Sequence, residues 1–250
     1  DADFGKAGAT LVSKDQAFAS DIVVKVKPPN DSEIALMKEG GAYIGFMNPL
    51  DEPEISNKMA ARGTTSLSME MVPRISRAQK MDALSALSSI AGYRAVLVAA
   101  ASSPKFFPLL TTAAGTVRPS NVLVLGAGVA GLQAIATARR LGAKVSAYDI
   151  REAVKEEVQS LGAAFVELEL EGQDSSDSGG YAKALVEEKA KQQTKLLVPV
   201  IGNSDVVVST ALIPGRKAPI LITEDAVKAM AEGSIIVDMA AQNGGNCELT

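Results

Sequence analysis

The strongest constraint on the fold is a glycine-spaced segment, VLVLGAGVAGLQAIATARRLGAKVSAYD, at residues 122–149. Gly126, Gly128 and Gly131 form a G-x-G-x-x-G array, which by itself is a weak signal in a chain with 21 glycines. Its context makes it specific, because a predicted strand precedes the array, an amphipathic helical pattern follows it, and a second predicted strand ends at Asp149. This order is typical of a strand–turn–helix–strand unit that binds a dinucleotide.

The residues of this unit have separate physical roles. Gly126 permits the tight turn, Gly128 lets backbone amides approach a pyrophosphate at the helix N-terminus, and Gly131 lets the helix pack closely on the strand. Asp149 would accept hydrogen bonds from the adenosine ribose and would repel a 2′-phosphate, which favours NAD(H) over NADP(H). Arg151 could hold such a phosphate, and the tight turn could also form without any ligand.

The length of the chain predicts two domains. A chain of 250 residues exceeds one typical domain, and each half is long enough to bury its own core. In the first part short apolar runs alternate with helical patterns, which is typical of a parallel α/β sheet. The predicted strands there are at 9–12, 21–27, 42–47 and 63–72, with helices at 32–39 and 53–63. A helical pattern then runs from Ser76 to about Ala101.

The second half repeats the α/β rhythm. Its predicted strands are at 122–126, 144–148, 163–168, 205–210 and 234–239, and its clearest helices at 129–141 and 223–231. The polar, Gly- and Ser-rich stretch at 171–193 is either surface decoration or a functional lid. We therefore predict an α/β fold of two Rossmann-like parallel-sheet domains, a first at 1–101 and a dinucleotide-binding one at 121–250, joined by a connection at 102–120.

Composition argues against several classes of function. A net charge of −4 and 4% aromatic residues give no basis for nucleic-acid binding. The chain has no histidine and one cysteine, Cys247, so neither a disulfide framework nor a Cys-built zinc site is expected. Asp174 and Asp177 lack fellow ligands, so we predict no metal site. Arg94 interrupts the longest apolar run, and we predict neither a membrane span nor a signal peptide.

The segment VPRISRAQKMDALS, residues 72–85, places polar side chains directly after an apolar run. Ser76 and Gln79 have the S-x-x-Q spacing of a capping box, in which case the motif merely starts a helix and its arginines are solvated. Gln79, Asp82 and Ser85 also follow at steps of three, which places them on one stripe of a helix. Such a stripe could face the crevice where the second domain holds a dinucleotide. Spacing alone leaves both interpretations open.

Five segments of the chain resemble the NAD(H)-binding domain I, or alpha subunit, of the proton-translocating NAD(P) transhydrogenases. They are VPRISRAQKMDALSALSSIAGYRAV, VLVLGAGVAGLQAIATARRLGAKVSAYDIR, SGGYAK, STALIPGRKAPILIT and IIVDMAAQNGGNCELT. The resemblance covers essentially the whole chain. It also implies that the chain is truncated at both ends, lacking the first strand–helix units of the first domain and everything after the last segment.

The resemblance implies a role for each matching residue. The side chains of Arg74, Gln79, Asp82 and Ser85, with Ile75 and Ser76 in the same motif, would hold the nicotinamide end of NAD(H). The pyrophosphate and adenosine ribose would lie against two groups: Gly126, Ala127, Gly128, Val129 and Gly131; Asp149, Ile150 and Arg151. Gly180 and Tyr181 match a mobile loop that closes over the nucleotide, Gln193 lies just beyond it, and Leu212 would touch the cofactor from the end of a strand.

The resemblance further implies an enzyme component of the Re/Si-specific type that works as a homodimer. It would present NADH for direct hydride transfer to NADP⁺ on a partner domain, while separate membrane segments translocate protons. The soluble domain would sit on the cytoplasmic side of a bacterial inner membrane or the matrix side of a mitochondrial one. No residue is expected to act as acid or base.

Alanine dehydrogenase is the nearest alternative, because it shares this fold. Its reaction differs, however, in that it needs a side chain that transfers a proton. In that enzyme a lysine of a VKVKEP-like segment and a later histidine do this work. The present chain keeps Lys25 and Lys27 but has Asn48 at about the place of the histidine. Asn48 cannot take up a proton, whereas hydride exchange between two nicotinamides needs only alignment of the rings. The chain could also be a non-catalytic NAD sensor or a purely structural protein.

Overall fold

The computed structural model describes residues 2–168, 180–213 and 216–250, and the side chains of 180–189 lie outside the described part. The chain divides into two compact units, Asp1–Ala86 and Leu87–Thr250. The boundary between them falls inside helix α5 (Ala83–Ser102), earlier in the chain than residue 101, where the sequence pattern places it. Each unit is described by itself.

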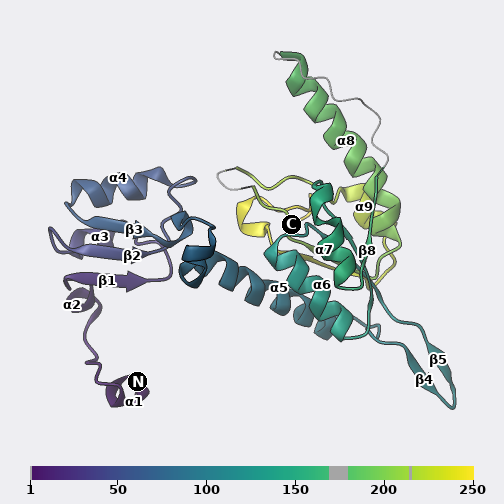
Figure 1. Ribbon diagram of the computed structural model, residues 1–250, viewed down its shortest axis with the longest axis horizontal. Coiled ribbons are helices and arrows are strands. Elements are labelled where there is room, and N and C mark those ends of the chain that lie inside the picture. Colours follow the sequence, from purple (N-terminus) through teal and green to yellow (C-terminus); the bar gives the residue numbers. More distant parts are fainter. Residues whose placement is uncertain (1, 169–179, 214–215) are drawn as a thin grey trace. The chain divides into compact units, whose positions relative to one another are not determined.

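The first unit is built on a three-stranded parallel sheet of order β1-β2-β3 (Figure 1). The strands are β1 (Ile22–Lys25), β2 (Ala42–Gly45) and β3 (Thr65–Ser68), and the helices are α1 (Ala2–Lys6), α2 (Lys14–Phe18), α3 (Asp31–Leu36) and α4 (Pro53–Ala61). Helices α3 and α4 connect successive parallel strands, as the alternating sequence pattern predicts. The core of the unit lies around Tyr43, Met37, Met47 and Met59, which are almost fully buried.

The strand predicted at residues 9–12 is wrong. Leu11 and Val12 are 63% and 52% exposed and pair with no strand of the described chain. The following residue, Ser13, begins helix α2 through a capping box with Gln16, so the apolar run ends in a helix start. The strand predicted at 63–72 is shorter than expected, because the chain turns into the 3₁₀ helix η1 (Met69–Met71) after Ser68.

The second unit contains a five-stranded parallel sheet of order β10-β9-β6-β7-β8. Its strands are β6 (Asn121–Leu125), β7 (Lys144–Tyr148), β8 (Ala164–Phe165), β9 (Val206–Ser209) and β10 (Ile235–Asp238). The chain runs outward from β6 to β7 and β8, then returns to β9 on the other side of β6. This reversal beside the first strand is the topological switch point at which open α/β sheets bind ligands. The predicted α/β fold and the five strands of this unit are confirmed.

Helices cover both faces of this sheet. They are α6 (Val129–Arg140), α7 (Lys155–Ser160), α8 (Gly180–Gly202) and α9 (Glu224–Ala229), with the 3₁₀ helices η3 (Glu152–Val154) and η4 (Ala241–Asn243). Alternate residues of β6 enter different cores: Val122 and Val124 pack with buried residues of α5 and α6, and Leu123 and Leu125 pack with buried residues of α8 and α9. A strand buried on both faces reads as the continuous apolar run seen in the sequence.

Helix α5 packs tightly on the start of α6. A Cβ added at Gly92 would lie 2.1 Å from the Ala130 carbonyl oxygen, so only glycine permits this approach. By length and composition alone α5 could cross a membrane, a property missed by the sequence prediction. Its residues Ala95, Val96 and Ala99 are part of the sheet's core, although only 22% of the tested stretch of α5 is buried.

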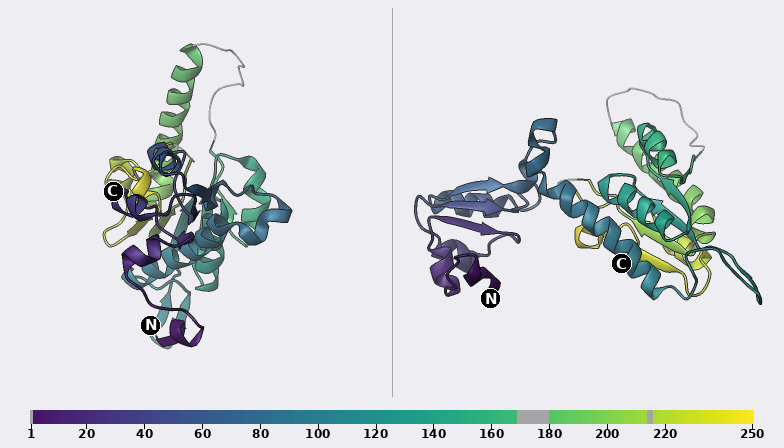
Figure 2. Two further views of the ribbon diagram at one scale, coloured as in Figure 1. Left: turned by 90° about the vertical axis from the view of Figure 1, so that its left-hand side faces the viewer. Right: turned by 60° about the horizontal axis from the view of Figure 1, so that its bottom comes forward.

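The connection at 102–120 contains an antiparallel hairpin. It is formed by β4 (Leu110–Thr112) and β5 (Gly115–Val117), with Leu110 opposite Val117. The hairpin extends away from the five-stranded sheet of its unit (Figures 1 and 2). Most of its residues are exposed, so packing within this unit does not explain it.

Candidate functional site

The first and third glycines of the array are required by the protein itself. Gly126 has φ +97°, and a Cβ there would lie 2.8 Å from Oγ1 of Thr210. A Cβ on Gly131 would lie 1.8 Å from the carbonyl oxygen of Gly126. These two residues therefore make the turn and the close contact between the helix and the strand end possible. Thr210, at the end of β9, adds a hydrogen bond from its hydroxyl to the Gly126 carbonyl at 2.9 Å.

Gly128 is different, because no atom of the described residues lies close enough to require glycine there. Its backbone has φ −78° and ψ −167°, which any residue can adopt, and an added Cβ would meet no atom within 4 Å. It is the N-cap of α6, a helix of 12 residues, and in the described chain the amides of Gly128 and Val129 donate to no other group. The open space beside these amides fits the close approach of a pyrophosphate.

Asp149 lies at the end of β7, beside the glycine loop, with a side chain only 7% exposed. It accepts hydrogen bonds from the Ala127 amide at 2.8 Å and from the amide and guanidinium of Arg151 at 2.8 to 3.0 Å. Burial raises the pKa of the Asp149 carboxyl, but the hydrogen bonds from Arg151 and Ala127 outweigh it, so the pKa lies below its usual value. The carboxylate is charged, as an acceptor for ribose hydroxyls must be. Ile150, which lies between Asp149 and Arg151 in the sequence, is 76% exposed.

The 72–85 motif forms a short 3₁₀ helix, η2 (Ser76–Met81), followed by the start of α5. The predicted capping box of Ser76 and Gln79 is wrong, because the N-cap of η2 is Ile75 and no side chain caps this helix. Asp82 caps α5 instead: its carboxylate accepts from the Ser85 amide at 2.9 Å and the Ser85 hydroxyl at 2.6 Å. These bonds from Ser85, with the positive charge of Arg74, lower the pKa of Asp82.

The motif therefore presents two kinds of polar group. Asp82 and Ser85 are engaged with each other and half-buried. The side chains of Arg74 and Gln79 are exposed and form no hydrogen bond with the rest of the described chain. Gln79 can contact a ligand without breaking a hydrogen bond of its side chain to the described residues, and Arg74 would give up only its electrostatic interaction with Asp82.

Two residues that the sequence interpretation missed hold the loop after β9. Asn246 is fully buried, donates to the carbonyls of Ala211 and Pro219 at 2.8 Å, and accepts from the Ala211 amide. Asp238, at the end of β10, accepts from the Asn246 amide at 2.7 Å and from the Ser209 hydroxyl. This network fixes the loop that carries Leu212, which is half exposed. Its members are far apart in sequence, so no local pattern identifies them.

The predicted mobile loop is only partly described. Its stretch at 169–179, with Asp174 and Asp177, and the Tyr181 side chain lie outside the described residues, whereas Gly180 is the first residue of α8. Gln193 is half-buried on the same helix. In the part of the chain that the structure describes, no three Asp, Glu, Cys or His side chains cluster as metal ligands.

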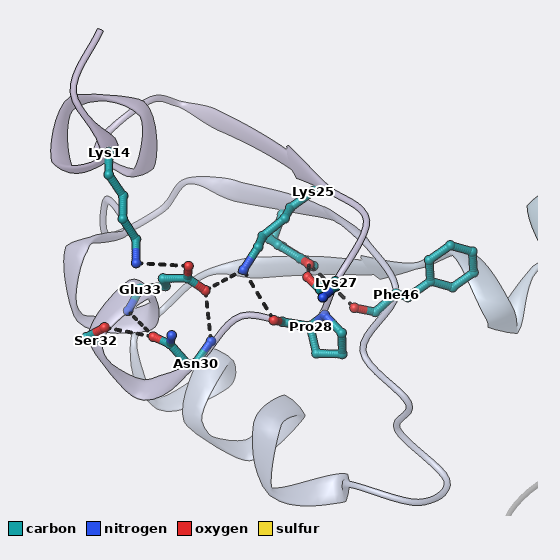
Figure 3. A network of polar contacts seen from close by, with 9 residues as sticks. Lys14, Lys25, Lys27, Pro28, Asn30, Ser32, Glu33 and Phe46 are labelled. Atoms are coloured by element: carbon teal, nitrogen blue, oxygen red, sulfur yellow. Dashed lines mark hydrogen bonds and ion pairs between the residues drawn. The ribbon is translucent and has the colours of Figure 1, made fainter. Parts of the chain in front are cut away.

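The lysines that could serve a dehydrogenase belong to the first unit (Figure 3). Lys25 and Lys14 point at Glu33, with Nζ–O distances of 2.5 and 3.1 Å, and the side chain of Glu33 is 7% exposed. The hydrogen bond from Lys25, with that from the Asn30 amide, lowers the pKa of Glu33 to about 2. Lys25 is thus engaged in an internal ion pair, whereas Lys27 is exposed.

Asn48, at the place expected for a dehydrogenase histidine, has a left-handed backbone with φ 51°. Its amide and that of Met47 both donate to the carboxylate of Glu70. The surrounding chain therefore fixes the backbone of Asn48. Its side chain offers a carboxamide, which is neither an acid nor a base at neutral pH.

The switch-point topology, the open glycine loop and the charged carboxylate at the end of β7 define a dinucleotide-binding protein of the Rossmann type. The chain belongs to the alanine dehydrogenase/PNT family: its residues 1–91 match the description "Alanine dehydrogenase/PNT, N-terminal domain" and residues 95–250 match "Alanine dehydrogenase/PNT, C-terminal domain". The predicted relationship is confirmed.

Within this family the chain is more similar to transhydrogenases than to alanine dehydrogenases. It is 47% identical to NAD(P) transhydrogenase subunit alpha of Haemophilus influenzae over 99% of its own length and 48% of that protein. The solved transhydrogenase of Sinorhizobium meliloti matches with a TM-score of 0.84 and 42% identity, over 99% of this chain and 67% of that one. Alanine dehydrogenase 1 of Staphylococcus aureus is 30% identical, over 98% of this chain and 61% of that one. The chain thus spans about half to two thirds of the relatives it matches.

Proposed function

We propose that this chain is the NAD(H)-binding component of an NAD(P) transhydrogenase of the Re/Si-specific type. The observation that carries the proposal is the open space at Gly128, which lies at the N-terminus of α6 beside the charged Asp149. Steric demands of the protein explain Gly126 and Gly131, whereas Gly128, the N-cap of α6, leaves open space that a pyrophosphate can occupy. The greater identity to transhydrogenase subunits than to alanine dehydrogenase supports this choice of reaction.

The two ends of the nucleotide are assigned to different residues. The amides of Gly128 and Val129 would bind the pyrophosphate, and Asp149, with Ile150 and Arg151 beside it, would lie against the adenosine ribose. Arg74 and Gln79, with Ile75 and Ser76, contact the nicotinamide end, where Asp82 and Ser85 complete the site. Leu212, Gln193, Gly180 and Tyr181 would provide further contacts to the cofactor. When bound, NADH supplies the hydride that passes to NADP⁺ on a partner domain.

This chain contributes position rather than acid–base chemistry. Hydride exchange between two nicotinamides consumes and releases no proton at a side chain, so its rate depends on how the rings are aligned. The Asp82 carboxylate is anchored by Ser85, and the exposed Arg74 and Gln79 can turn toward the ring. Together they would hold the nicotinamide end of NAD(H) in position for the acceptor.

We also propose the partners and the location that follow from this role. An NADP(H)-binding domain accepts the hydride, and a membrane domain couples the reaction to proton translocation. The chain forms a soluble domain peripheral to that membrane complex, on the cytoplasmic side of a bacterial inner membrane or the matrix side of a mitochondrial one.

A homodimer is supported by the surface of α5. Leu87, Ile90, Tyr93 and Val98 lie on one face of this helix and are 41 to 63% exposed. The opposite face carries Ala95, Val96 and Ala99 into the core. An apolar face of this kind, together with the projecting hairpin, offers a surface that a second copy can cover. The proposed homodimer is tested by measuring the molecular mass of the protein in solution. The Ile90→Glu substitution should reduce this mass from that of a dimer to that of a monomer.

The proposed function is tested by two measurements on the same protein. Titration followed by NADH fluorescence should show saturable binding, and addition of an NADP(H)-binding domain should allow hydride exchange between the two nucleotides. Binding without exchange would favour a non-catalytic NAD sensor, and no binding would contradict the proposal. Oxidation of L-alanine by NAD⁺ would support the dehydrogenase alternative, although Asn48 and the engaged Lys25 argue against it.

A further inference from the structure

The carboxylate of Asp149 has no acceptor site left for a ribose. A carboxylate offers about four lone-pair sites, two on each oxygen. Oδ1 accepts from the amide and Nε of Arg151 at 2.8 and 3.0 Å. Oδ2 accepts from the Ala127 amide at 2.8 Å and from Nη2 of Arg151 at 3.0 Å. Any hydroxyl that binds here must first displace one of these donors.

The four donors differ in how easily they can leave. The Ala127 amide belongs to the glycine loop, whose preceding residue Gly126 donates its own amide to the Tyr148 carbonyl at 2.8 Å. The Arg151 amide is likewise fixed by the backbone that follows Asp149. The guanidinium, in contrast, ends a side chain that is 57% exposed. Rotation of this side chain alone would free one site on each oxygen.

We propose that the guanidinium of Arg151 occupies the hydrogen-bonding sites of Asp149 that the ribose would use. The guanidinium leaves these sites when nucleotide binds. The 2′- and 3′-hydroxyls bring two donors in place of the two guanidinium N–H groups, so the carboxylate keeps four hydrogen bonds in both states. The exchange explains how an almost buried carboxylate remains charged and satisfied without ligand. This inference rests on the proposed function and adds that Arg151 weakens nucleotide binding by competing with the ribose.

The test compares wild type with Arg151→Met, which removes the guanidinium and keeps an unbranched apolar stem. Arg151→Met should bind ADP-ribose about two- to fivefold more tightly, the factor that a partly exposed ion pair is worth. Binding of reduced nicotinamide mononucleotide, which lacks the adenosine, should not change. Arg140→Met is the matched control, because it removes an exposed arginine from the end of α6 in the same unit, away from Asp149.

A second readout follows the hydroxyls directly. The ratio of the affinities for ADP and 2′,3′-dideoxy-ADP should rise in Arg151→Met, and Arg151→Lys, which can pair with only one oxygen, should give an intermediate ratio. Weaker or unchanged binding of ADP-ribose by Arg151→Met, or an unchanged ratio, would overturn the inference while leaving the proposed function intact. Failure of wild type to bind both ADP-ribose and NADH would instead contradict the proposed function.

Discussion

The glycine loop and the 72–85 motif illustrate two ways in which sequence encodes a binding site. In the loop, the backbone is shaped by steric demands that only glycine meets, at Gly126 and Gly131, and one glycine, Gly128, leaves space. In the motif, side chains carry the information: Asp82 and Ser85 satisfy each other, and Arg74 and Gln79 remain exposed. Each region thus contains residues whose contacts stabilise the fold and residues that remain open to a ligand. Substitutions can distinguish the two kinds, because the first should lower stability and the second should weaken binding.

The largest effect is expected for Gly131→Ala. The new Cβ would lie 1.8 Å from the Gly126 carbonyl oxygen, so α6 must move away from the strand end. We expect a loss of about 2 to 3 kcal/mol in the free energy of unfolding, typical of overpacking, together with loss of NADH binding. Urea denaturation followed by circular dichroism measures the first quantity. A variant as stable as wild type would show that the contact is not required.

Gly128→Ala should affect binding far more than the fold. Among the described residues no atom lies within 4 Å of the new Cβ and the backbone there is in an ordinary region, so the cost to the fold is limited to replacing glycine by alanine at the N-cap of α6. The methyl group would stand between the amides and a pyrophosphate, so the dissociation constant of NADH should rise about tenfold or more. Fluorescence titration measures this change, with the melting temperature as control. Unchanged affinity would mean that the pyrophosphate does not approach Gly128.

In the motif, Asp82→Ala and Asp82→Asn should differ in stability. Alanine removes the cap of α5, whereas asparagine can still accept from the Ser85 amide, so only Asp82→Ala should lower the melting temperature, by about 2 to 4 °C. Because the pKa of Asp82 is depressed in the folded protein, the charge-dependent part of its contribution is present above about pH 4 and is lost as the pH falls through the lower folded-state pKa. In thermal melts between pH 3 and 7, the difference between wild type and Asp82→Ala should therefore narrow toward low pH.

The loop and the motif are not equally predictable. The turn, helix and strand around Gly126, Gly128 and Gly131 follow from local spacing, because the left-handed turn at Gly126 and the close contact of Gly131 with the Gly126 carbonyl lie within a few residues of each other. The capping box predicted at Ser76 is wrong, since spacing cannot show that Asp82 forms the stronger helix start a few residues later. The same limitation explains the incorrect strand at 9–12.

Several features are encoded through space rather than along the chain. The buried hydrogen-bond network of Asp238 and Asn246 joins the ends of two strands to the segment after β10, and it has no local signature. The occupation of Asp149 by Arg151 could not be predicted either, because Arg151 in the sequence suggests a phosphate ligand rather than a partner for the carboxylate.

The most direct test of the account is a cyclic hydride-transfer assay with an NADP(H)-binding domain, comparing wild type, Gln79→Asn and Asp82→Asn. Both substitutions keep the polarity of the motif and should leave the melting temperature and the affinity for ADP-ribose unchanged. We expect hydride transfer to fall about tenfold or more in each, because misalignment of the nicotinamide slows the step that alignment controls. If both variants bind NADH and transfer hydride as fast as wild type, the motif does not position the nicotinamide and the central claim is contradicted.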